Sequence, residues 1–187
     1  MPPKVRITKD SIIDAAIGIV RSYGVQGVNA RTIASVLKCS TQPIFSNFET
    51  MEELHIAVVL RANELCDEYI KREIERGEFP PYKASGMAYI RFAKEEKELF
   101  KLLYMRDRTG ETYSKEFEFG NLVENIVRDS TGLNDENMRL FHLEMWAYVH
   151  GIATMFVTGF VDIDWNLVSR MLTDAYQGMR KHYGIGD

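Results

Sequence analysis

Apolar residues recur at helical spacing along this chain. Near the N-terminus, a single helix face would carry Ile12, Ala16, Ile19, Val20 and Tyr23. Strand signals are nearly absent, since no Asn-Gly or Asp-Gly hairpin turn separates alternating apolar runs. The pattern therefore predicts an all-α protein.

Capping signals divide the first fifty residues into three short helices. Thr8 is placed to cap the first helix, Gly24 ends it, and Asn29 is placed to cap the second. Pro43 indicates where the third helix begins, because proline is tolerated in the first turn of a helix and disrupts its interior. We expect that helix to start near Ser40, with Ser40 as its cap. Two short helices joined by a tight turn are the layout of a helix-turn-helix.

The rest of the chain is predicted to be a helical bundle. Residues 50–53 (TMEE) match a capping box, with Thr50 as the N-cap and Glu53 at the third position. They start a long helix that should run to about Arg76, before Gly77 and two prolines. Further helices are expected near residues 82–93, 94–104, 114–129, 135–158 and 165–182.

Charge is distributed unevenly along the chain. The 187 residues carry a net charge of −4, which by itself argues against nucleic acid as a partner. Residues 1–50, however, hold six Lys/Arg against three Asp/Glu, whereas residues 51–187 carry a net charge of −7. A basic segment at residues 1–50 followed by an acidic segment at residues 51–187 favours contact between the first segment and phosphate. We expect residues 1–50 to form a DNA-binding domain and residues 51–187 a second domain, connected by the helix at 51–76.

Other functional classes find little support. Cys39 and Cys66 lack the CxxC spacing of a metal site, and the first ten residues lack the apolar core of a signal peptide, so a reducing cytoplasm is expected. The apolar run at 143–161 contains Glu144 and His150, which favours a buried helix over a membrane span. No Ser–His–Asp set, HExxH, P-loop or metal-ligand spacing occurs, so no catalytic site, metal or cofactor is predicted.

The first turn of the third helix offers polar groups that suit the edges of base pairs. Gln42 can make a bidentate pair with adenine, and Thr41 can donate, accept or touch a thymine methyl group. In isolation such residues are explained as solvated cap residues, but within a whole helix-turn-helix we interpret them as DNA contacts. The basic residues and Thr32 are assigned to phosphate, which sets register. The candidate DNA-binding residues are Arg6, Lys9, Arg31, Thr32, Lys38, Ser40, Thr41, Gln42, Pro43, Phe45 and Asn47.

The second domain carries two further features. Aromatic and methionine side chains are dense in its middle, as is typical of adaptable apolar pockets and also of ordinary cores. Small residues at helical spacing and a broad apolar stripe in the last helix favour contact between two copies, with packing inside one subunit as the open alternative. The candidate effector-binding residues are Tyr89, Phe100, Tyr104, Phe117, Asn125, Met145, Trp146 and His150. The candidate dimer residues are Ala147, Gly151, Thr154, Thr158, Trp165, Val168, Met171, Leu172, Tyr176 and Met179.

Residues 9–55 also contain a set with a specific order and spacing: Ile13, Ala15, Ala16, Gly24, Ile33, Ala34, Ser40, Phe45, Phe48, Glu53 and Leu54. This set resembles the N-terminal pattern of TetR-family transcriptional regulators. The segment that contains Trp146, His150 and Gly151 resembles a motif in the C-terminal domain of one subgroup. The resemblance implies an N-terminal three-helix HTH DNA-binding domain, followed by a C-terminal helical-bundle domain for ligand binding and dimerisation.

Several positions depart from the pattern of that family. Lys38 stands where the family usually has a glycine, and Gln42 replaces a small residue. Phe45, Asn47 and Met51 stand where Tyr, His and Lys are common, so that some expected phosphate contacts are missing. These departures predict an unusual operator.

The function implied by the resemblance is that of a ligand-responsive regulator, expected to be a repressor, which binds a palindromic duplex DNA operator as a homodimer. A small apolar or amphipathic effector would shift the helix at 51–76 and change the separation of the two recognition helices. Two other interpretations stay open. One is a helical protein-interaction module, which salt-dependent binding to duplex DNA would exclude. The other is a small helical enzyme, which would need a catalytic constellation within hydrogen-bond reach.

Overall fold

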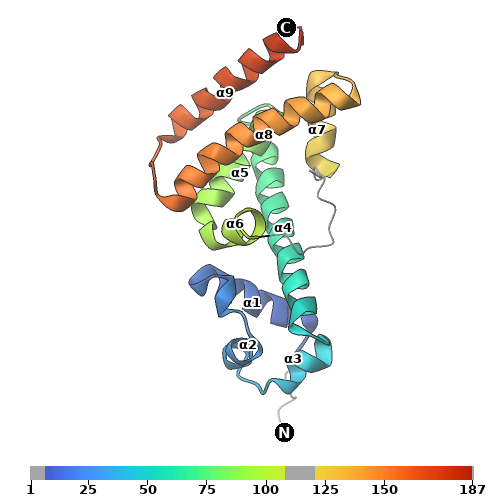
Figure 1. Ribbon diagram of the computed structural model, residues 1–187, viewed down its shortest axis with the longest axis vertical. Coiled ribbons are helices and arrows are strands. Elements are labelled where there is room, and N and C mark those ends of the chain that lie inside the picture. The colour runs from blue at the N-terminus through green and yellow to red at the C-terminus, as the bar shows by residue number, and fades with distance from the viewer. Residues whose placement is uncertain (1–6, 108–120, 187) are drawn as a thin grey trace. The chain divides into compact units, whose positions relative to one another are not determined.

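The computed structural model describes residues 7–107 and 121–186, and within those residues every regular element is a helix. The predicted all-α fold is therefore confirmed. In chain order (Figure 1) the elements are α1 (Lys9–Tyr23), the short 3₁₀ helix η1 (Val25–Gly27), α2 (Ala30–Val36), α3 (Gln42–Asn47), α4 (Met51–Arg76), α5 (Pro81–Glu95), α6 (Lys97–Tyr104), α7 (Asn121–Thr131), α8 (Asp135–Thr158) and α9 (Trp165–His182).

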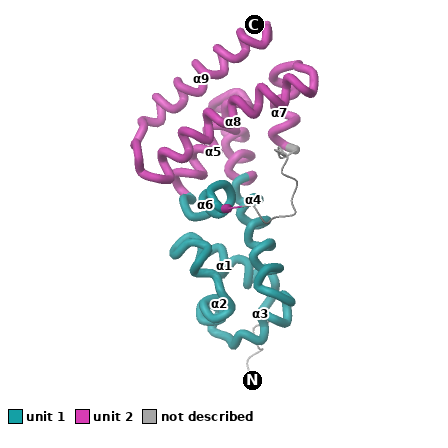
Figure 2. The backbone as a smooth tube through the Cα atoms, in the orientation of Figure 1, with its two compact units in different colours: residues 1–66, 96–106 teal, residues 67–95, 107–187 magenta. Residues whose placement is uncertain are grey.

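The helices gather into two compact units (Figure 2). Unit 1 consists of residues 1–66 and 96–106, and unit 2 of residues 67–95 and 107–187. The long helix α4 therefore contributes residues to both units, and α6 belongs to unit 1 although it follows α5 of unit 2. The boundary expected at residue 50 falls inside unit 1.

Helix α1 begins and ends where its capping residues predict. The Thr8 hydroxyl accepts a hydrogen bond from the Ser11 N–H at 3.2 Å, and the Ser11 hydroxyl accepts one from the Thr8 N–H at 3.0 Å. Gly24 ends the helix with a φ of +75°, a value that suits glycine. Tyr23, the last residue of the predicted apolar stripe, does not share the burial of the others, since its side chain is 72% exposed. The helix ends at this residue, and Ile17 is buried in the core instead.

Helix α6 is tied to α1 within unit 1 by a charged pair. The Arg21 guanidinium donates two hydrogen bonds to the Glu96 carboxylate, from Nε at 2.9 Å and from Nη2 at 2.7 Å. Glu96 is also the residue that precedes the first turn of α6. Bidentate pairing of this kind fixes geometry as well as distance, so it orients the start of α6 against the end of α1.

Unit 2 is built around α5 and α8, which pack along each other. Met87 and Phe92 of α5 and Phe141 of α8 are fully buried. Polar groups join the same two helices, since the Tyr82 hydroxyl lies 2.9 Å from His142 Nδ1. Burial lowers the pKa of His142 to about 4, so the imidazole is neutral at physiological pH.

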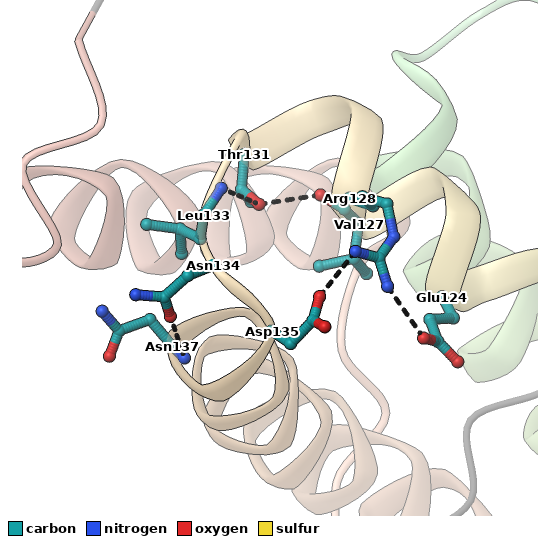
Figure 3. A network of polar contacts seen from close by, with 8 residues as sticks. All are labelled: Glu124, Val127, Arg128, Thr131, Leu133, Asn134, Asp135 and Asn137. Atoms are coloured by element: carbon teal, nitrogen blue, oxygen red, sulfur yellow. Dashed lines mark hydrogen bonds and ion pairs between the residues drawn. The ribbon is translucent and has the colours of Figure 1, made fainter.

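The connection between α7 and α8 is held by a polar network (Figure 3). Arg128 of α7 donates to Glu124 on its own helix at 3.1 Å and to Asp135 at the start of α8 at 2.6 Å. The Asn134 side chain caps α8 by accepting from the Asn137 N–H at 3.0 Å. Because local caps define this end, the predicted span 135–158 for α8 is confirmed.

Two parts of the sequence-based assignment fall outside the described residues. These are residues 114–120 of the helix expected at 114–129, and the candidate site residues Arg6 and Phe117. Within the described part, α7 ends at Thr131, immediately before the predicted stop at Gly132.

Candidate functional site

Helix α2 begins at a reciprocal cap. Asn29 Oδ1 accepts hydrogen bonds from the N–H groups of Arg31 and Thr32, each at 3.0 Å. The Thr32 hydroxyl accepts from the Asn29 N–H at 3.2 Å and lies 2.7 Å from the Gly27 carbonyl, to which it donates. The predicted cap at Asn29 is confirmed. The Thr32 hydroxyl is thereby already engaged inside the helix-turn-helix.

The turn between α2 and α3 contains the only described residue other than glycine with a positive φ, namely Lys38 at +51°. The turn closes through a hydrogen bond from the Cys39 N–H to the Ala34 carbonyl at 2.9 Å. A side chain in this left-handed region costs roughly 1–2 kcal/mol. This strained position is the one where the family that the N-terminal pattern resembles usually has a glycine. In this chain it carries the exposed cation of Lys38.

Helix α3 begins at Gln42, slightly later than predicted. The Thr41 carbonyl accepts from the N–H groups of Ile44 at 3.1 Å and Phe45 at 3.3 Å, so helical hydrogen bonding first closes at Thr41. The prediction that Ser40 caps the helix is therefore wrong, and Thr41 precedes the first turn without a side-chain cap. Pro43 lies in the first turn, as predicted.

Two apolar side chains anchor α3 and thereby fix the face that it exposes. Ile44 is 0% exposed and Phe48, which follows the helix, is 3% exposed. Phe45, next to Ile44 but on another side of the helix, is 50% exposed. Burial of the first two side chains leaves Gln42 and Phe45 facing solvent on the short helix.

A group of polar side chains around this turn is available to a partner. None of them makes a side-chain hydrogen bond or an ion pair with any residue that the structure describes, and each is exposed or half-buried. A large anion would meet two cations and three neutral hydrogen-bonding groups here. The group consists of Arg31, Lys38, Ser40, Thr41 and Gln42.

Two other residues predicted to contact DNA have side chains that already interact with other parts of the protein. Lys9 Nζ lies 3.2 Å from Glu53 Oε1 and 5.0 Å from the centre of the Phe48 ring. Asn47 Nδ2 donates to the Pro43 carbonyl at 2.8 Å and lies 3.5 Å from the carbonyl of Ile7. These contacts hold α3 against the residues around the start of α1.

In unit 2, three of the predicted effector residues come together. The Tyr89 hydroxyl lies 3.0 Å from His150 Nδ1, and the Trp146 ring stacks on the His150 ring with a centroid distance of 4.6 Å. Burial lowers the pKa of His150, so the cluster is neutral at physiological pH. Met145, the residue before Trp146 in the sequence, is buried, whereas Asn125 of α7 is exposed.

The other described effector candidates belong to unit 1. The rings of Phe100 and Tyr104 on α6 lie 4.9 Å apart, and the Tyr104 hydroxyl lies 3.7 Å from Cys66 Sγ. Phe100 is fully buried and Tyr104 is half-buried. The aromatic effector candidates that the structure describes therefore form one group in each unit.

The predicted dimer residues differ in how much surface they offer. Val168 and Leu172 of α9 are 0% and 3% exposed, so they are already buried within the single chain. Tyr176 and Met179 pack against the core that contains Phe141. On α8, by contrast, Ala147 and Thr158 are exposed, and Gly151 and Thr154 are half-buried. Leu140, Leu143 and Tyr148, which the sequence-based list omitted, expose 48%, 40% and 39% of their surface on the same helix.

Among residues 7–107 and 121–186, no three or more His, Cys, Asp or Glu side chains are grouped so that they would hold a metal ion. Over the same residues, no helix has both the length and the apolar character that crossing a membrane requires.

A family model decides the identity of the chain. The model described as "Tetracyclin repressor-like, C-terminal domain" matches residues 82–175, just over half of the sequence. The chain belongs to the TetR family. The matched residues lie outside the segment 9–55 that carries the N-terminal resemblance, so the predicted family is confirmed from a separate part of this TetR-family regulator.

Solved structures of TetR-family proteins share its fold. A TetR-like transcriptional regulator from Rhodococcus sp. RHA1 has a TM-score of 0.65 at 17% identity, covering 98% of this chain and 99% of that chain. A TetR-family member from Streptomyces coelicolor A3 has a TM-score of 0.59 at 19% identity, covering 89% and 96%. The multidrug binding protein EbrR, complexed with malachite green, has a TM-score of 0.58 at 18% identity, covering 92% and 98%. No curated protein sequence matches.

One residue of this TetR-family regulator was missed as a site residue by sequence reasoning. Glu53 was predicted to complete a capping box with Thr50, and the Thr50 hydroxyl does accept from the Glu53 N–H at 3.1 Å. The Glu53 carboxylate, however, accepts from the Glu49 N–H at 2.7 Å and holds Lys9. No local pattern signals the second contact, because the two residues lie far apart in the sequence.

Proposed function

We propose that this TetR-family protein is a ligand-responsive repressor that binds a palindromic operator as a homodimer in the cytoplasm. The proposal is carried by the polar and basic side chains around the turn that precedes α3, which have no side-chain partner among residues 7–107 and 121–186. A surface helix whose hydrogen-bonding groups are already satisfied has little to offer a base pair, whereas the side chains of Gln42 and Thr41 bond to no described residue.

Base readout is assigned to the exposed face of α3. Gln42 pairs with adenine through its amide, and Thr41 donates, accepts or contacts a thymine methyl group. Phe45, half exposed beside them, and Pro43 supply apolar contact to thymine. Arg31, Lys38 and Ser40 contact phosphate and set the register of the helix in the major groove.

Two copies are needed for an operator of useful length, because one helix-turn-helix contacts few base pairs and dimers read half-sites about 34 Å apart. The exposed stripe of α8 supports contact between two copies. Leu140, Leu143 and Tyr148 are each at least 39% exposed, while Ala147 and Gly151 permit close approach of a second helix. Apolar area of this kind is unfavourable in water when uncovered.

The effector is assigned to the aromatic group in unit 2. Buried Tyr89 and half-buried Trp146 and His150 form a neutral, largely aromatic cluster. Aromatic lining of this kind suits a small apolar or amphipathic molecule. EbrR, which shares the fold, forms a complex with malachite green, and this aromatic dye is therefore a rational first probe. To act as a switch, the effector must favour one separation of the recognition helices over the other.

The experiment for DNA recognition is selection of bound sequences from random duplexes, followed by titration at several salt concentrations. Gln42→Ala should lower operator affinity by about 1–3 kcal/mol and relax preference at one base pair in each half-site. The matched control is Gln177→Ala, which removes the same group from an exposed position on α9. An unchanged sequence preference in Gln42→Ala, or binding without salt dependence, would contradict the proposal.

The effector is tested with malachite green and the selected operator. Fluorescence titration should show dye binding that Trp146→Leu weakens at least severalfold, and saturating dye should lower operator affinity of the unsubstituted protein. Dye that binds without any change in operator affinity would contradict a switch for this ligand. Failure of malachite green to bind would remove this dye from the candidate effectors.

A further inference from the structure

Of the three cations Lys9, Arg31 and Lys38, Lys9 is the one that the described structure pairs with an acid. Its ammonium lies 3.2 Å from Glu53 Oε1 and 5.0 Å from the centre of the Phe48 ring. Arg31 and Lys38, by contrast, make no ion pair with any described residue. The three cations of this surface are therefore not equivalent before DNA arrives.

Glu53 is itself held from a second direction. Its Oε2 atom accepts the Glu49 N–H at 2.7 Å, and its own N–H donates to the Thr50 hydroxyl at 3.1 Å. The Glu49 N–H first, and Lys9 second, lower the pKa of the Glu53 carboxyl below its usual value. The carboxylate thus stands at the start of α4 as a fixed anion with one oxygen directed to Lys9.

The field of DNA acts on both members of this pair. A duplex carries about one negative charge per 1.7 Å of its axis. If Lys9 left Glu53 for a phosphate, the carboxylate would remain uncompensated close to the duplex and would be repelled by it. Lys9 would gain a contact with phosphate but lose its contact with Glu53, so the exchange would add little to the binding free energy. Arg31 and Lys38 would give up only contacts with water.

From this geometry we propose that Glu53 occupies the place of a DNA phosphate at Lys9 and so lowers the affinity of the protein for any duplex. The inference rests on the proposed DNA-binding function and adds a specificity-determining residue to it. Because phosphate contacts carry no sequence information, removal of one from each subunit lowers non-specific binding and leaves discrimination to Gln42 and Thr41.

The test is the salt dependence of binding to a scrambled duplex and to the selected operator. Glu53→Gln keeps an oxygen that accepts from the Glu49 N–H, and it releases Lys9 to contact phosphate. Affinity for the scrambled duplex should rise roughly fivefold per subunit at 0.15 M salt, with a slope of log K against log salt steeper by about 0.9 per subunit. Circular dichroism melting checks that the variant is folded.

The matched control is Glu52→Gln. Glu52 is exposed on the same turn of α4 and makes no ion pair with the described residues, so this variant removes the same charge without releasing a lysine. Its salt slope should stay close to that of the unsubstituted protein. If Glu52→Gln and Glu53→Gln change the slope equally, general acidity and not a phosphate mimic explains the effect, and the inference is overturned.

Two further variants decide the role of Lys9 independently, even if Glu53→Gln does not fold. Lys9→Gln alone leaves the Glu53 carboxylate uncompensated and should lower affinity, but it removes no phosphate contact, so its salt slope should change by much less than about 0.9 per subunit. Lys9→Gln combined with Glu53→Gln should return the slope to that of the unsubstituted protein. A slope flatter by about 0.9 per subunit in Lys9→Gln would show that Lys9 already contacts phosphate, and would overturn the inference.

The outcome also separates this inference from the proposed function. Operator binding that depends on Gln42, with identical salt slopes in all Glu53 and Lys9 variants, removes only the role of Glu53. Absence of salt-dependent binding in the unsubstituted protein removes both.

Discussion

Polar side chains are used in opposite ways in the two units. In unit 1, Arg31, Lys38 and Gln42 face solvent without a partner among the described residues. In unit 2, by contrast, the Tyr82 hydroxyl of α5 and the His142 imidazole of α8 are buried and lie 2.9 Å apart. Water forms hydrogen bonds with an exposed group and can be displaced from it by a ligand. A buried group must instead be paired within the protein to avoid a desolvation penalty of a few kcal/mol. Free groups mark a binding surface, and paired groups hold a scaffold.

Charge follows the same division. Glu73 of α4 is 2% exposed and accepts from Arg76 at 2.9 Å, with Arg91 Nε of α5 at 3.4 Å. The Arg91 guanidinium in turn lies 4.5 Å from the centre of the Trp165 ring at the start of α9. In unit 2 a buried charge thus joins three helices. Stability and DNA recognition should therefore respond to different residues.

The largest expected contrast is between two phenylalanines. Phe141→Ala empties a fully buried position in unit 2 and should lower the free energy of unfolding by about 3–5 kcal/mol. Phe45→Ala removes a half-exposed side chain from α3 and should change that free energy by less than about 0.5 kcal/mol while it weakens operator binding. Urea unfolding at one protein concentration, with operator titration, measures both. Equal loss of stability in the two variants would break the contrast between the units.

An intermediate effect is expected from acid, through His142 in unit 2. The unfolded chain takes up a proton at this imidazole near pH 6.5, whereas in the folded protein burial lowers the pKa to about 4. The unfolded state binds more protons between these values, so the free energy of unfolding falls as pH is lowered from 6.5 to 4, by on the order of 3 kcal/mol. Above pH 6.5 this group contributes no pH dependence.

The contribution of His142 is isolated by comparison with His142→Gln, whose amide can still bond to the Tyr82 hydroxyl. Urea unfolding of both proteins is measured from pH 4 to pH 7.5. The difference between the two curves should diminish as the pH falls through this window. Parallel curves would show that the imidazole titrates normally and that its burial does not control its charge.

The smallest effect is expected in unit 1, at the strained turn. Lys38→Gly relieves a positive φ but makes the unfolded chain more flexible, so a net stabilisation of roughly 0.5 kcal/mol is expected. The same variant should weaken binding to all duplexes and flatten the salt slope by about 0.9 per subunit. Thermal melting and salt titrations measure the two effects. Loss of stability, or an unchanged slope, would show that Lys38 is retained for its structure and not for phosphate.

The sequence located local features well. The caps at Thr8 and Asn29, the end of α1 at Gly24, and the spans of α8 and α9 are all confirmed. These features depend on residues within one or two helical turns, so they can be read from spacing alone. The start of α3 was placed too early, because Ser40 is chemically a good cap and only the backbone shows that Thr41 supplies the first helical carbonyl.

The candidate sites depended more on tertiary contacts. Spacing placed Tyr23 on the apolar stripe of the first helix, and it left Val168 open between contact with a second copy and packing inside one subunit. In the structure Tyr23 is 72% exposed and Val168 is 0% exposed. Periodicity identifies which residues share a face, but it does not identify what covers that face. Likewise, composition grouped Tyr89 with Phe100, and the structure assigns them to different units.

By itself, the sequence determined that this chain is helical, where most helices begin and end, and to which family it belongs. These properties follow from hydrogen bonds and side-chain spacing over a few residues. Only the tertiary structure decided which polar groups of the described residues have a partner, since Lys9 and Glu53 are 44 residues apart in sequence and 3.2 Å apart in space. Whether a charge is available to DNA depends on that distance, because the attraction between two charges depends on their separation in space.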